Sequence, residues 1–138
     1  MTWTEKEVPS LELCRRLKEL GYPQEGGGWY WAKIGESWIL ELQTEFKEVP
    51  AYASEYVKAP TCRELGEWLP IYLEEDIYLD IDHPSPDVWI VSYIKTTHPL
   101  QESIIAFDDN TEPNARAKML IWLVENGYVE FKEGKGED

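Results

Sequence analysis

The chain has 138 residues and a net charge of −14, from 27 Asp and Glu against 13 Lys and Arg. Its length suits one domain, and a hydrophobic content of 43% with 13% aromatic residues supports a packed core. Because DNA, RNA and anionic membranes attract basic proteins, this charge argues against direct nucleic-acid or membrane binding. An acidic surface instead suits a basic protein partner, mimicry of a nucleic acid, or solubility alone.

The first predicted element is a helix over residues 10–20. In "SLELCRRLKELGY", Ser10 suits the N-cap and Gly21 the position after the last turn. Leu13, Leu17 and Leu20 fall on one stripe, as a buried helix face requires. The start of the chain has neither the basic nor the apolar region of a signal peptide, so we expect a cytoplasmic protein.

A hairpin is predicted next, with strands over residues 29–34 and 38–46 joined by a turn at Gly35 and Glu36. The glycines at 26–28 precede a strand and lack the lysine and the following helix of a phosphate-binding loop. They are interpreted as a flexible loop. Residues 47–58 show no regular pattern.

The stretch "APTCRELGEWLP", residues 59–70, predicts a two-turn helix. Thr61 and Glu64 have the spacing of a capping box, in which each side chain accepts a hydrogen bond from the other residue's backbone. Pro70 forces Leu69 out of helical geometry and ends the helix.

A second hairpin is predicted over residues 76–96, with "HPSP" as its turn, followed by a strand over 103–107. The last predicted helix begins near Thr111, with Pro113 in its first turn, and ends at Gly127. The fold class is therefore α+β, with an antiparallel-dominated sheet of about five strands packed by three helices in the order α-β-β-α-β-β-β-α. Residues 1–138 are expected to form one domain, with 130–138 as a frayed tail.

Three blocks carry a resemblance: "PSLELCRRLKELGY", "APTCRELGEWLP" and "NARAKMLIWLVENGY". With these blocks the chain resembles a family of small uncharacterised proteins of bacteria and of phages or prophages. The resemblance implies a domain spanning the whole chain and an origin in a mobile element. It implies no activity, ligand or catalytic residue.

Asp80, Asp82 and His83 are the candidate metal ligands, because carboxylates and an imidazole can hold a divalent ion. The alternative is that these acids lie on a solvated strand face. Cys14 and Cys62 fall on apolar helix positions and have no histidine beside them, so we expect reduced core residues and not nucleophiles. No cofactor is predicted.

Helices can cover only one face of the predicted sheet, so its other face should present aromatic side chains among acids. The candidate contact residues are Trp29, Trp31, Tyr78 and Trp122. The pattern favours a non-enzymatic accessory or interaction domain that binds a basic protein. Two alternatives stay open: a small metal-dependent hydrolase using the Asp/His cluster, and a small-ligand or carbohydrate binder built on exposed tryptophans.

Overall fold

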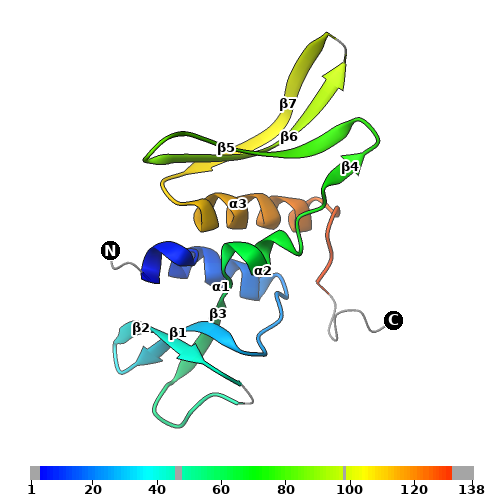
Figure 1. Ribbon diagram of the computed structural model, residues 1–138. Helices are drawn as coiled ribbons and strands as arrows, with labels where there is room; N and C mark the ends of the chain where they lie inside the picture. The colour runs from blue at the N-terminus through cyan, green and yellow to red at the C-terminus, as the bar shows by residue number, and fades with distance from the viewer. Residues whose placement is uncertain (1–3, 46–47, 98, 132–138) are drawn as a thin grey trace.

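The computed structural model describes residues 4–45, 48–97 and 99–131 of the chain. In these residues, a layer of helices lies between two antiparallel sheets (Figure 1). The helices are the 3-10 helix η1 (Thr4–Glu7) and the α-helices α1 (Leu11–Glu19), α2 (Cys62–Gly66) and α3 (Glu112–Glu125).

The first sheet has the strand order β2-β1-β3 and the second has the order β4-β5-β6-β7. The first is built from β1 (Gly28–Ile34), β2 (Ser37–Gln43) and β3 (Glu55–Ala59). The second is built from β4 (Tyr72–Glu74), β5 (Ile77–Ser85), β6 (Val88–Thr97) and β7 (Leu100–Asp109).

The α+β class and the three helices are confirmed, but the single sheet of about five strands is wrong. The described elements follow the order α-β-β-β-α-β-β-β-β-α after η1. The two additional strands are β3, which pairs with β1, and β4, which pairs with β5. Each hairpin forms from its own local pattern, and that pattern does not determine whether two hairpins share a sheet.

The helices begin where their capping residues predict. Ser10 caps α1 by accepting a hydrogen bond from the Leu13 N–H, at 3.3 Å. Both hydrogen bonds of the capping box between Thr61 and Glu64 are present at the start of α2. Thr111 caps α3 through the Asn114 N–H, at 3.4 Å.

The largest core lies between the helices and the second sheet. It joins residues of α1, α2 and α3 to the strand side chains that face them, including Leu17, Leu65, Leu120, Val91 and Tyr93. A second cluster lies between α1 and the first sheet and contains Cys14, Trp31 and Val57. Helix α1 therefore contributes to both of these clusters, since Leu17 belongs to one and Cys14 to the other.

The last described residue, Phe131, packs edge-on against Trp68 and Tyr22, with ring centroids 4.9 and 5.2 Å apart. Residues 132–138 of the expected frayed tail lie outside the described residues. Within the described ranges, no helix has both the length and the apolar character that crossing a membrane requires.

Candidate protein-interaction surface

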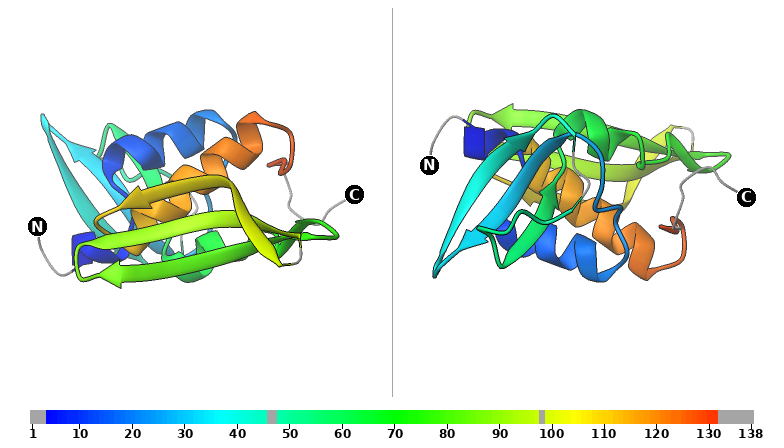
Figure 2. Two further views of the ribbon diagram at one scale, coloured as in Figure 1. Left: turned by 90° about the horizontal axis from the view of Figure 1, so that it is seen from above. Right: turned by 90° about the horizontal axis from the view of Figure 1, so that it is seen from below.

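The four-stranded sheet has one face against the helices and a second face, here called the outer face, over which no described helix lies. Figure 2, seen from above, shows the sheet in front of the helices with nothing drawn over it. Along β5, Ile77, Leu79 and Ile81 pack into the core. Because side chains alternate along a strand, the residues between them project from the outer face.

One end of the outer face is acidic. Asp82 pairs with Ile90, and Ile90 pairs in turn with Asp108 of β7. Asp80 lies two residues before Asp82 on β5, and therefore on the same face, opposite Ser92 of β6. The strand register thus brings three aspartates from two strands to one end of the same face.

The other end carries tyrosine and isoleucine side chains. Tyr78 pairs with Tyr72 on β4 and with Ile94 on β6. Ile104 lies in a β-bulge opposite Ile94 and is 43% exposed, while Tyr72 is 63% exposed. The Tyr78 hydroxyl accepts a hydrogen bond from Gln101 Nε2 at 3.2 Å, which holds this ring against β7.

The outer face carries no compensating positive charge among the described residues of β5, β6 and β7. Lys95 is the one Lys or Arg in these strands, and it pairs with Ile77, so it projects from the opposite face. Its Nζ lies 3.9 Å from Asp76 Oδ2. The outer face therefore combines an apolar and aromatic area, over which no described helix lies, with three aspartates that no Lys or Arg of these strands faces.

The predicted metal ligands do not converge. Asp80 and Asp82 share the outer face, as their spacing predicts. The His83 ring instead stacks on Trp89, with centroids 3.8 Å apart, and its Nδ1 lies 2.9 Å from the Val88 carbonyl oxygen. Within the described residues, no three His, Cys, Asp or Glu side chains are grouped so that they could hold a metal ion. The hydrolase alternative thereby loses the convergence on which it depended.

The four predicted contact rings lie in three different environments. Trp31 is buried in the second core, where its Nε1 donates to the Pro9 carbonyl at 3.3 Å, and Trp29 packs beside it. Trp31 therefore offers no exposed platform to a sugar. Tyr78 is partly exposed on the outer face, whereas Trp122 is half-buried and stacks on Tyr128 at 5.6 Å.

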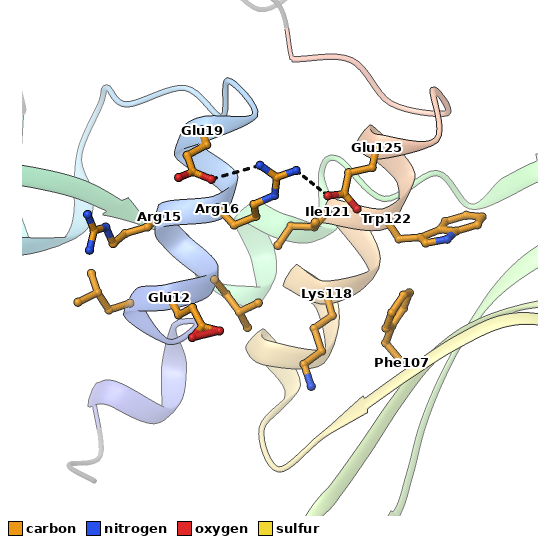
Figure 3. Close-up of a pocket in the computed structure, with 11 residues that line it drawn as sticks. Glu12, Arg15, Arg16, Glu19, Phe107, Lys118, Ile121, Trp122 and Glu125 are labelled. Atoms are coloured by element: carbon orange, nitrogen blue, oxygen red, sulfur yellow. Dashed lines mark hydrogen bonds and ion pairs between the residues drawn. The ribbon is translucent and has the colours of Figure 1, made fainter.

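Trp122 lines a groove between α1 and α3, here called the α1–α3 groove, with a volume of about 760 Å³. Figure 3 shows Trp122, Ile121 and Lys118 on α3, with Phe107 of β7 beside them. Arg16 crosses one end of the groove, where its guanidinium binds Glu125 at 2.7 Å and Glu19 at 3.2 Å (Figure 3). The apolar floor is thus flanked by ion pairs that are already satisfied within the chain.

Gly27 and Gly28 lie against a buried lysine, whereas Gly26 has open space around it. Lys58 of β3 is 3% exposed, and its Nζ donates to the Gly27 carbonyl and lies 3.4 Å from Glu64 Oε2. A Cβ at Gly28 would lie 2.8 Å from that Nζ, and Gly28 has a φ of +123°. Two of the three glycines that the sequence placed in a flexible loop therefore lie against the Lys58–Glu64 ion pair, and one of them, Gly28, begins β1.

Both cysteines are poor nucleophiles. Burial raises the pKa of the Cys14 thiol far above its ordinary value, although the hydrogen bond with Trp31 opposes the shift. Burial, reinforced by the Glu112 carboxylate, raises the pKa of Cys62 to about 12. Since the thiolate is the reactive species, the raised pKa values disfavour attack by either thiol at neutral pH. Cys14 is buried as predicted, while Cys62 is only half-buried.

Sequence reasoning missed several outer-face residues, namely Tyr72, Ile94, Ile104 and Asp108. The alternation of Ile105 and Phe107 with Ala106 and Asp108 was the available signal for extending the last strand beyond residue 107. Comparisons of the chain with protein-family models, with curated proteins and with solved structures found no match.

Proposed function

We propose that this chain is a non-enzymatic interaction domain that binds a basic protein through the outer face of its four-stranded sheet. The observation that carries the proposal is a sheet face over which no described helix lies, with Asp80, Asp82 and Asp108 at one end and exposed tyrosine and isoleucine at the other. Aromatic rings supply contact area, and uncompensated charge selects partners of opposite sign. The mobile-element origin stays a prediction.

The net charge supports a basic partner. At −14 the whole molecule attracts cationic surfaces over distances of about a Debye length, roughly 8 Å at physiological salt. The outer face adds a local preference, because its three aspartates lie beside the apolar area. Binding should therefore weaken as salt rises while keeping a salt-resistant apolar contribution.

The test is a selection from a displayed library of random peptides against the full chain. We expect the enriched peptides to carry net positive charge. They should bind the triple variant Asp80→Asn, Asp82→Asn and Asp108→Asn roughly tenfold more weakly, because each exposed ion pair contributes about 0.5 kcal/mol to the free energy of binding. Asparagine keeps the oxygen of Asp82 that accepts from the His83 N–H, so local structure is retained.

The matched control is Glu25→Gln, Glu36→Gln and Glu48→Gln, three exposed acids outside the four-stranded sheet. It changes the net charge by the same amount and should leave affinity nearly unchanged. Enriched peptides without a positive bias, or equal losses in the two triple variants, would overturn the proposal.

A further inference from the structure

The free edge of β7 adjoins the α1–α3 groove. β7 is the last strand in the order β4-β5-β6-β7, and among the described residues no strand pairs with it on the side away from β6. It runs for ten residues, Leu100–Asp109, without a proline. A strand edge of this length presents N–H and C=O groups that can pair with another extended chain, although one of these carbonyls, that of Asp108, already accepts a hydrogen bond from Lys118.

A hydrogen bond to the backbone identifies groups that face the free edge. Lys118 Nζ donates to the carbonyl oxygen of Asp108 at 3.1 Å, so this carbonyl points away from β6 toward α3. In an antiparallel pair, successive residues direct their backbone groups alternately toward and away from the neighbouring strand. The backbone groups of Ala106 therefore also point toward the free edge.

A fifth strand on this edge would lie about 4.8 Å beyond β7. Figure 2, seen from above, shows α3 along the edge of β7 and α1 farther out on the same side. The groove is lined by half-buried Leu13, Phe107, Ile121 and Trp122. One set of alternate side chains of the added strand would enter this groove, and the other set would project beside Asp108 on the outer face.

We propose that β7 accepts an extended peptide segment in which apolar residues alternate with basic ones. The apolar residues would fill the α1–α3 groove, and the basic residues would lie beside the acidic end of the outer face. The inference rests on the proposed function for the charge of the partner, and it adds the binding mode, strand addition to a free sheet edge.

Charge also argues against a second copy as the occupant. Antiparallel pairing of β7 with the β7 of another molecule would bring together two chains of net charge −14. Glu102, Asp108 and Asp109 of each strand would then lie near those of the other. Like charges placed across a strand pair are destabilising, whereas basic side chains there are stabilising.

The test measures amide hydrogen exchange by NMR on the full chain, with and without a basic peptide obtained from the library selection. We expect the Ala106 and Asp108 amides to become protected when the peptide binds, because their N–H groups gain acceptors. Amides of β4, at the opposite edge of the sheet, provide the internal reference and should keep their exchange rates.

Two series of modified peptides test the binding mode without changing the protein. N-methylation at alternate positions should weaken binding roughly fivefold per methyl group in the register that faces β7, and little in the other register. Replacing with serine the apolar residues of the set that enters the α1–α3 groove should weaken binding. Replacing any apolar residues of the set that projects beside Asp108 should weaken it less.

The outcomes separate the two proposals. If no basic peptide is enriched, the proposed function fails. If basic peptides bind the outer face but Ala106 and Asp108 stay unprotected, and both methylation registers bind equally, strand addition is refuted while the proposed function stands. If the same amides become protected without peptide as the protein concentration rises and the chain dimerises, the occupant of the β7 edge is a second copy of the chain. That result would refute the proposal of a basic peptide as its occupant.

Discussion

Glu64→Gln should destabilise the protein more than its half-exposed position suggests, because it leaves a buried lysine without its counter-charge. Lys58 is 3% exposed, its Nζ lies 3.4 Å from Glu64 Oε2, and that Nζ also lies 4.9 Å from the Tyr30 ring centroid. Glutamine keeps the oxygen that caps the Thr61 N–H, at 3.0 Å in the native chain. The substitution thus removes the charge and retains the cap.

The magnitude follows from the distance. At an effective dielectric constant of about 20, unit charges 3.4 Å apart attract by roughly 5 kcal/mol. The Glu64 side chain is 31% exposed, so water screens part of this attraction, and the Gly27 carbonyl and the Tyr30 ring still contact the cation. We expect the free energy of unfolding to fall by about 2 kcal/mol.

The assay is urea unfolding followed by far-ultraviolet circular dichroism, with Glu67→Gln as the control. Glu67 is exposed at the end of the same helix, so its loss should change the free energy of unfolding by less than about 0.5 kcal/mol. The double variant Lys58→Met with Glu64→Gln should be more stable than Glu64→Gln alone, because methionine fills the site without a charge. Equal urea midpoints for Glu64→Gln and Glu67→Gln, or a double variant less stable than Glu64→Gln, would refute the reasoning.

Three further predictions concern stability. Gly28→Ala should lower the free energy of unfolding by about 1–3 kcal/mol in thermal melts, because its φ is +123° and its Cβ would lie 2.8 Å from Lys58 Nζ. Gly26→Ala, where φ is +83° and no atom lies within 4 Å, should cost only about 1 kcal/mol, and equal losses would contradict the role given to Lys58. Because the pKa of Cys62 rises from 9.0 to about 12 on folding, the unfolded chain loses that proton first, and stability should fall as pH rises from 9 toward 12. Urea midpoints of Cys62→Ser should show a shallower fall over this range, and an unchanged slope would exclude the thiol as a cause. Leu123→Ala, at a fully buried position, should cost about 2–5 kcal/mol in urea unfolding, whereas Leu100→Ala, at 72% exposure, should change stability by less than about 0.5 kcal/mol.

Local signals in the sequence predicted most of the helices and hairpins. The hydrogen bonds of Ser10, Thr61 and Thr111 act within one turn of their own helix, so the residue type and its spacing suffice to place each helix start. Alternation likewise identified β5, since the residues of each face are adjacent along the strand.

The missed strands depend on contacts that are distant in sequence. β3 shows no alternation, because Tyr56, Val57 and Lys58 are all buried, and the lysine among them forms an ion pair with Glu64. β4 has only three residues, too few to show a period, and its pairing with β5 is irregular. The separation into two sheets likewise depends on which strand each hairpin pairs with, and no local pattern encodes that choice.

The same limit applies to the candidate surface. Tyr78, Asp80 and Asp82 could be assigned to one face from their spacing alone. Asp108 joined them only through the register of two strand pairs, and the stacking of His83 on Trp89 could not be foreseen from a two-residue alternation. The groove beside β7 also required knowledge of how α1 and α3 pack together.

Helix α1 supplies Leu17 to the core beneath the four-stranded sheet and Cys14 to the core beneath the three-stranded one. Detaching this one helix would therefore expose apolar side chains on both sides of the molecule at once. Cleavage in the segment between α1 and β1 should yield no fragment that survives a protease by itself. Heating should likewise melt both sheets in a single cooperative transition, with no half-folded species accumulating.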